Sequence, residues 1–361
     1  MTEAAIHEGE SDAVTDHTSL SEVKRKLFQE YVRGAVGKAG AERAPIRPRP
    51  HGIPIPLSFA QQQIWLHGQM ASDVPFYNET MTVYRHGPLD LTTLERCLLE
   101  IIRRHEIWRT TFEVVAGEPV QIVHPAPRVI PLPLVDLRKL QEPEREAEAI
   151  RLATEDARSP FDLKNGPLLR ALLIRIADEQ FRLYMTVHQI VFDAVTAYRV
   201  FLPELATLYE AFVAGKPSPL PDLPLQYADF AFWQRRSCSD YTGAEHLSYW
   251  REQLAGEISP LQWPNDRPRP PIETHRGAVQ RFALPAHLVR NLRRLSQQEG
   301  VSVYMTLLAG FVAMLHRFTG QQEIIVGSFT AGRNQAELEP LLGYFVNPLT
   351  LRVDVSGNPT F

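Results

Sequence analysis

Residues 187–194 (VHQIVFDA) place a histidine and an aspartate, His188 and Asp193, in an otherwise apolar stretch. The stretch leaves a predicted strand and enters a predicted helix, which is where α/β proteins place ligands. A His and an Asp in such surroundings lose their water and each needs a partner. Two interpretations stay open from the residues alone. The segment is a ligand site, or it holds a buried His–Asp or Asp–Arg pair that fixes the turn.

An arginine is the expected partner of Asp193, because a buried carboxylate requires a compensating charge. Arg109 and Arg276 are the favoured structural candidates. His105 and Glu106 are adjacent and could suggest acid–base chemistry, but a structural role is the preferred interpretation. The twelve histidines show no HExxH or paired spacing, so we predict no metal site.

Composition excludes several functional classes. The chain has 361 residues, enough for two domains or one two-lobed domain. Lys+Arg minus Asp+Glu is 38 − 42 = −4, which argues against a generic nucleic-acid binder. The two cysteines, Cys97 and Cys238, form no CxxC pair and fit a reducing cytosol. No signal peptide and no 18-residue apolar run is present, so we expect a cytoplasmic protein without membrane contact.

Alternating apolar patterns define the elements that must position this segment. Strands are predicted at 168–175 and 181–187, and a helix at 195–213, so that residues 187–194 form the turn between them. Upstream, residues 1–18 are predicted to be disordered, and residues 19–56 to form an amphipathic helix and a proline-rich linker. Downstream, helices are predicted at 286–299 and 302–318, and strands near 278–284 and at 323–329. The mixture predicts two α/β lobes.

Five blocks of the chain, in order, resemble the motifs of condensation domains of nonribosomal peptide synthetases. They are residues 57–65 (LSFAQQQIW), 104–112 (RHEIWRTTF), 188–194 (HQIVFDA), 227–234 (YADFAFWQ), and 332–333 (GR) with 343–352 (GYFVNPLTLR). The third block stands where the family has HHxxxDG.

The resemblance implies a fold like chloramphenicol acetyltransferase, a pseudo-dimer of two α/β (α+β, two-layer) lobes in a V. The lobes would span residues 57–225 and 226–361, the second truncated at its C-terminus, so that the chain is a fragment of a longer synthetase or lacks part of that lobe. Donor and acceptor peptidyl carrier proteins would bring thioesters on phosphopantetheine arms into a tunnel between the lobes, with no cofactor bound by the domain itself. Downstream adenylation and carrier domains are further expected partners.

The resemblance also assigns residues. His188, Gln189 and Asp193 are the implied catalytic positions, and Ala194, Ser328 and Asn347 the implied substrate-binding positions. Gln189 replaces the second His of the motif and Ala194 its closing Gly. Because Gln takes no proton near pH 7, base catalysis at this position is lost, although its carbonyl can still position an amine. Two hypotheses follow: a weakened amide-forming acyltransferase, or an inactive relative that recruits a partner enzyme or gates carriers.

Overall fold

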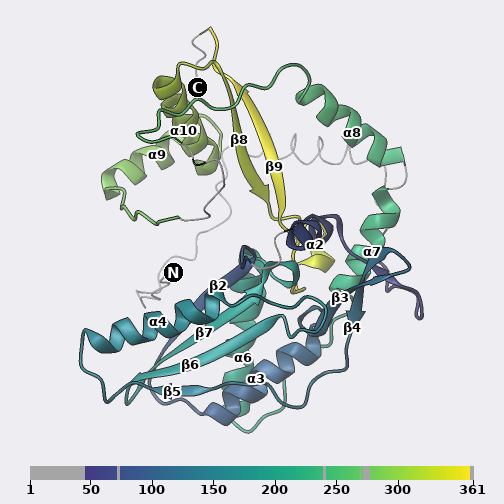
Figure 1. Ribbon diagram of the computed structural model, residues 1–361, viewed down its shortest axis with the longest axis vertical. Coiled ribbons are helices and arrows are strands. Elements are labelled where there is room, and N and C mark those ends of the chain that lie inside the picture. Colours follow the sequence, from purple (N-terminus) through teal and green to yellow (C-terminus); the bar gives the residue numbers. More distant parts are fainter. Residues whose placement is uncertain (1–44, 71–73, 239–240, 269, 271–276, 358–361) are drawn as a thin grey trace, which may run out of the picture. The chain divides into compact units, whose positions relative to one another are not determined.

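The computed structural model describes residues 45–70, 74–238, 241–268, 270 and 277–357. The chain divides into two compact units, shown in Figure 1. The first contains the chain up to Gly243 together with Ala331–Asn347, and the second contains Ala244–Thr330 and Pro348–Phe361. The predicted amphipathic helix at 19–34 lies outside the described residues.

A four-stranded sheet forms the centre of the first unit, in the order β2-β7-β6-β5. The strands are β2 (Asn78–His86), β7 (Gln180–His188), β6 (Leu169–Ala177) and β5 (Leu134–Asp136). β7 runs antiparallel to both β2 and β6, and β5 runs parallel to β6. The two central strands agree with the predicted ones. The edge strand β2 was not predicted, and its register places Asn78 opposite His188.

Helices cover both faces of this sheet. α3 (Leu91–Arg104) buries an apolar stripe and packs with α6 (Leu202–Val213) against the face that carries Val187. α4 (Glu144–Arg158) packs on the opposite face, where Ala149 contacts the side of β6 and β7 that carries Ile174 and Tyr184. Because successive strand residues point to opposite faces, Val187 faces α3 and α6 while His188 faces the side of α4.

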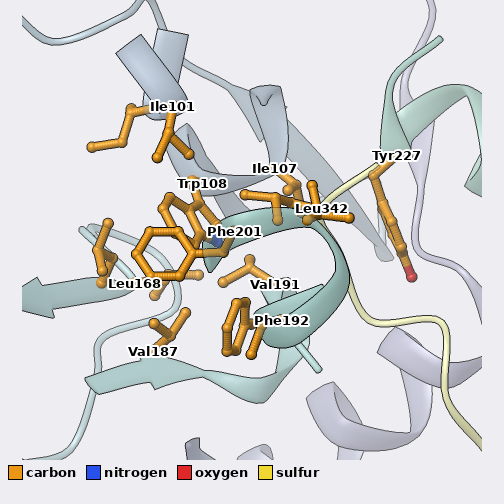
Figure 2. Close-up of a cluster of buried hydrophobic side chains, with 14 of the residues drawn as sticks. Ile101, Ile107, Trp108, Leu168, Val187, Val191, Phe192, Phe201, Tyr227 and Leu342 are labelled. Carbon is orange, nitrogen blue, oxygen red and sulfur yellow. The ribbon is translucent and has the colours of Figure 1, made fainter. Parts of the chain in front are cut away.

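The core between α3, α6 and the sheet also includes residues from far along the sequence. Figure 2 shows Ile101 of α3, Trp108, Phe201 and Val187 in this cluster, with Leu342 near them. All of these side chains are at most 3% exposed. The segment that contains Leu342 therefore belongs to the first unit by its burial.

A second, smaller sheet has the order β1-β4-β3, with β1 (Ile55–Pro56), β3 (Thr110–Val115) and β4 (Glu118–Val123). β3 and β4 form a hairpin, and its turn uses Ala116 and Gly117 at positive φ. α2 (Phe59–Met70) and α7 (Tyr227–Cys238) pack beside this sheet, together with the 3-10 turn η1 (Glu106–Arg109).

Part of the predicted linker is docked on the first unit. Ile46 is buried, and Arg49 makes ion pairs of 2.8 Å with both Asp229 and Glu106. The proline-rich stretch from residue 45 therefore packs on α7 and η1.

The second unit contains most of α8 (Tyr241–Gln253), and α9 (Ala286–Gln298), α10 (Val303–Thr319), β8 (Glu323–Thr330) and nearly all of β9 (Asn347–Asp354). The strand predicted near 278–284 is wrong, because residues 277–285 have no regular secondary structure. The two strands of this unit pair with each other, and Val279 and Phe282 are exposed.

No single helix in the described part of the chain is long and apolar enough to cross a bilayer. The pair α9 and α10 meets the length and composition criteria only when joined across a bend of 106°.

Candidate active site

His188 ends β7 and is 8% exposed. Its Nδ1 accepts a hydrogen bond from the Ile190 N–H at 3.2 Å, so the neutral ring carries its hydrogen on Nε2. The rings of Tyr77 and Phe161 each lie 6.0 Å from the imidazole, centroid to centroid. Burial lowers the pKa of His188 to about 4. The side chain is therefore a neutral hydrogen-bond donor at pH 7.

Gln189 follows at the start of the 3-10 turn η2 (Gln189–Val191). Its backbone N–H donates to the Tyr77 carbonyl at 2.7 Å, which extends the β2–β7 pairing by one step. Its side chain is half-buried, and its amide makes no hydrogen bond within the part of the chain that the structure describes. The amide oxygen is thus free to accept a hydrogen bond from a ligand.

Asp193 is 2% exposed and connects two distant segments. Its Oδ1 accepts from the Thr196 N–H at 2.7 Å, which caps the short helix α5 (Ala194–Thr196). Its Oδ2 accepts from the N–H groups of Phe345 at 2.9 Å and Val346 at 3.3 Å. With both oxygens engaged by backbone donors, Asp193 fixes the turn after β7 to the segment 331–347.

The arginine that pairs with Asp193 is Arg333. Its guanidinium lies 3.3 Å from Oδ2 of Asp193 and also donates to Thr196 Oγ1 at 2.7 Å and to the Leu341 carbonyl at 3.0 Å. Its Cζ lies 4.0 Å from the ring centre of Phe345. Burial lowers the pKa of Arg333, and the charge of Asp193 opposes that effect.

The prediction that Arg109 pairs with Asp193 is wrong. Arg109 donates to the His124 carbonyl and lies 3.8 Å from Glu106, and Asp193 is paired with Arg333 instead. Arg276 lies outside the described residues. Arg333 was visible in the sequence as part of the 332–333 block, but a pairing across 140 residues leaves no local periodicity to reveal it.

Two glycines in the segment 331–347 allow very close contacts, one within the segment and one with the ring of Tyr227. Gly332 has φ 66°, and a Cβ on it would lie 1.9 Å from the Phe345 carbonyl oxygen. Gly343 has φ 151°, and a Cβ there would lie 2.0 Å from the Tyr227 ring. Tyr227 also donates to the Tyr344 carbonyl at 2.5 Å. The blocks 227–234 and 343–352, far apart in the sequence, are therefore in direct contact. The approach is this close because glycine has no Cβ.

A second buried cluster holds the same segment. His105 Nδ1 accepts from the Leu342 N–H at 3.3 Å, and its Nε2 lies 2.9 Å from Glu204. Arg104 pairs with the other oxygen of Glu204 at 2.9 Å. Burial lowers the pKa of His105, so the ring is neutral and donates to the carboxylate. This geometry fits the structural role preferred for His105.

The substrate-binding candidates lie in different units. Ala194 is the exposed first residue of α5, where its Cβ meets no conformational penalty. Asn347 is half-buried at the start of β9 in the first unit. Ser328 lies on β8 of the second unit, where its Oγ is 2.5 Å from the Tyr304 hydroxyl. Their roles toward substrate stay predictions.

Glu79 is a candidate that sequence reasoning missed. It stands opposite Val187 in the β2–β7 ladder and is half-buried, and within the described residues its carboxylate has no cationic partner. Burial, reinforced by the charge of Asp193, raises the pKa of Glu79. The alternation of Glu79, Met81 and Val83 on one face could have revealed both this strand and a polar position at its inner end.

Metal chemistry has no visible basis in the described part of the chain. No group of three or more His, Cys, Asp or Glu side chains there has an arrangement that could hold an ion. The chemistry available at residues 188–196 is hydrogen bonding by a neutral imidazole and by an amide, beside a carboxylate that is already fully engaged.

Comparison with known protein families identifies the family to which this chain belongs. The family model of the Condensation domain matches residues 54–361. The chain belongs to the condensation-domain family. Condensation domains take their substrates from the phosphopantetheine arms of carrier proteins and bind no cofactor of their own. The mixed helix and sheet architecture predicted from the sequence is confirmed.

Relatives of this condensation domain are large peptide synthetases. A linear gramicidin synthase of Brevibacillus parabrevis is 45% identical over 325 residues, which are 90% of this chain and 4% of the relative. Phosphinothricin tripeptide synthetase PhsC of Streptomyces viridochromogenes is 40% identical over 351 residues, or 97% of this chain and 32% of the relative. The chain therefore spans a small part of the length of these relatives.

Solved structures with the same fold include two kinds of domain. The X-domain from teicoplanin biosynthesis has a TM-score of 0.77 and 28% identity, with 88% of this chain and 69% of that chain covered. The first condensation domain of the CDA synthetase has a TM-score of 0.72 at 23% identity, covering 85% and 72%. At that identity the second match shows the fold alone.

Proposed function

We propose that this condensation domain joins a carrier-bound acyl thioester to a carrier-bound aminoacyl amine. The amine nitrogen attacks the thioester carbonyl, the C–N bond forms, the C–S bond breaks, and the donor arm leaves as a thiol after taking up the proton that the amine loses. The observation that carries the proposal is the intact framework around Gln189. The Asp193–Arg333 pair, the two close glycines and His188 are all in place on either side of the substituted position.

Gln189 acts in this reaction as a positioning group. Its side-chain oxygen accepts a hydrogen bond from the attacking amine, while proton removal is left to solvent. Loss of a positioned base reduces a rate by about 10²–10⁴. Proximity of the two arms retains much of the remaining acceleration, because holding two reactants together converts a bimolecular step into an effectively unimolecular one.

The reaction requires two carrier proteins, a donor and an acceptor, whose arms reach the turn at residues 188–194. Downstream adenylation and carrier domains would supply the acceptor, and the whole would work in the cytoplasm. The likeness to synthetases that are far longer than this chain supports these assignments.

A second function, recruitment of a partner enzyme without bond formation, is favoured by a separate observation. Among the similar structures is a complex of the X-domain and OxyB from teicoplanin biosynthesis, at 27% identity and a TM-score of 0.76. That domain, of the same fold, is thus seen with a partner protein. Combined with the loss of the second motif histidine, this supports a binding role for the present chain.

One reconstitution separates the two functions. The purified protein is mixed with a donor carrier bearing an acyl arm and an acceptor carrier bearing an aminoacyl arm, and the amide is followed by mass spectrometry. The amide-forming function predicts product from the unmodified protein, less product from Gln189→Ala, and up to about 10²–10⁴-fold more from Gln189→His. Absence of product from both the unmodified protein and Gln189→His, with both carriers bound, would overturn it in favour of recruitment.

A further inference from the structure

One edge of β6, the edge opposite β7, is paired over only part of its length. β5 pairs with β6 from Leu173 onward and leaves the first half of that edge without a strand. On the other edge, the Leu168 carbonyl accepts from the His188 N–H at 3.0 Å. Because hydrogen-bonding groups alternate along a strand, those of Leu169 and Ala171 point away from β7. Within the described residues, neither has a backbone partner on that open edge.

The proline content of the preceding segment explains why the pairing stops. Residues 125–133 (PAPRVIPLP), which lead into β5, contain proline at four of nine positions. The Leu173 N–H donates to the Pro133 carbonyl at 3.0 Å. The next bond of a parallel ladder would run from the N–H of residue 133 to the Ala171 carbonyl, and proline has no N–H to donate. The ladder therefore ends one step before Ala171.

A cavity of about 720 Å³ lies beside this open edge. Leu169 and Ala171 line it, and so do Arg170 and Leu172, whose side chains point to the other face of the sheet. The cavity is thus at the edge of the strand rather than on one of its faces. Its volume is within the range of ligand sites. Leu169 and Ala171 are 6% and 7% exposed, and backbone groups so buried are seldom left unpaired.

The charges around the cavity favour an uncharged ligand. Asp156 is paired with Arg170 at 2.9 Å, and Asp162 accepts from two backbone N–H groups. Arg109 donates to the His124 carbonyl. Since each of these charged side chains already has a partner, the groups that remain for a ligand are the backbone N–H and C=O groups of the strand edge. Alternating donors and acceptors of this kind match the backbone of another strand.

We propose that this cavity binds a short uncharged peptide in an extended conformation, which adds to β6 as a strand at Leu169 and Ala171. Backbone hydrogen bonds would give the affinity, and apolar side chains of the peptide would fill the cavity, as in other cases of strand addition. The site is on the edge of β6 that faces away from β7, and binding here requires neither a carrier protein nor a reaction. The proposal is therefore independent of amide formation at Gln189.

The first experiment measures binding of acetyl-Ala-Val-Ala-methylamide to the unmodified protein by titration calorimetry. Two analogues carry a single N-methyl group, one on the valine nitrogen and one on the nitrogen of the alanine that follows it. Because successive N–H groups of an extended peptide point to opposite sides, only one analogue loses a bond to β6. We expect that analogue to bind about tenfold or more weakly and the other to bind like the parent peptide.

Amide hydrogen exchange of the unmodified protein locates the peptide. Without peptide, the N–H groups of Leu169 and Ala171 should exchange faster than those of Arg170 and Leu172, which point to β7 and serve as internal controls. Saturating peptide should slow exchange at Leu169 and Ala171 and leave the two controls unchanged.

Pro133→Ala tests the cause of the open edge. The substitution supplies the missing N–H, which can donate to the Ala171 carbonyl and extend the β5–β6 ladder by one step, so peptide binding should weaken. Pro127→Ala is the matched control, because it makes the same change in the same segment away from the end of the ladder, and it should bind the peptide like the unmodified protein. Circular dichroism of both variants confirms that they are folded.

Three results, all obtained with the unmodified protein, would overturn the proposal. The first is no binding of the parent peptide at millimolar concentration, which would assign the cavity to water only. The second is equal affinity of the parent peptide and both N-methyl analogues, which would show an apolar site without strand pairing. The third is binding without added protection at Leu169 and Ala171. Equal binding to Pro133→Ala and Pro127→Ala would likewise contradict it.

Discussion

Arg333 and Asp193, 140 residues apart in the chain, form an ion pair of 3.3 Å in which both side chains are at most 5% exposed. The pair is one part of a network, since Asp193 also accepts from two backbone N–H groups of the 331–347 segment, and Arg333 donates to Thr196 and Leu341. The turn after β7 is therefore held by charge and backbone hydrogen bonds together. The amide of Gln189 is presented from a turn whose two ends are fixed.

Asp193→Ala should destabilise the protein, because it leaves Arg333 buried and unpaired. Removing one partner of a buried pair costs about 3–5 kcal/mol. Chemical denaturation monitored by circular dichroism gives the free energy of unfolding. Arg109→Ala is the matched control: Arg109 was the arginine expected beside Asp193, but it contacts His124 and Glu106, so its loss should be nearer to about 1 kcal/mol. Equal losses for the two variants would contradict the assignment of Arg333.

Gly332→Ala should destabilise by more than the penalty of its backbone conformation alone. A left-handed φ costs a non-glycine residue about 1–2 kcal/mol. At Gly332 the added Cβ would also meet the Phe345 carbonyl at 1.9 Å, which forces the segment to move. Gly215→Ala separates the two effects, because Gly215 has φ 68° and open space around its Cβ position. A thermal melt of each variant should show the larger loss for Gly332→Ala, and similar losses would contradict the close approach.

Acidification should destabilise the domain between pH 6.5 and about 4. The pKa of His188 falls from an ordinary value of 6.5 to about 4 on folding. In that window the unfolded chain binds more protons than the folded one, so stability is complete above pH 6.5 and falls as the pH is lowered. The loss from His188 amounts to about 3 kcal/mol. The pKa of His105 is lowered as well, so it adds to the loss in the same direction.

Urea denaturation of the unmodified protein and of His188→Asn across this pH range checks whether His188 causes the loss of stability on acidification. The variant cannot titrate at position 188, so its stability should depend less steeply on pH while the contribution of His105 persists. Identical slopes would show that His188 is not the group responsible.

The sequence predicted those parts of the site whose signals are local. The alternation of β6 and β7, the turn at 187–194 and the helix after it follow from neighbouring residues, and all are present. The pairing of Asp193 with Arg333 was not predictable in this way, because the register that joins them is set by tertiary packing. The strand predicted near 278–284 is absent for the converse reason. Its local pattern suits a strand, but no neighbouring strand in the described part of the second unit pairs with it.

Glu79→Gln should raise the stability of the protein at pH 7. The carboxylate lies on the apolar face of β2 beside the charge of Asp193, and its raised pKa shows that the folded state disfavours its ionised form. A neutral amide of nearly the same shape removes that cost. The gain should exceed the roughly 0.5 kcal/mol that ordinary surface substitutions reach. It should also shrink as the pH is lowered, because the carboxyl group then becomes protonated in both states.

Denaturation at pH 7 and at lower pH measures both effects. Glu118→Gln, at an exposed position of β4, is the control and should change neither. A loss of stability in Glu79→Gln would show instead that the carboxylate is compensated within the fold.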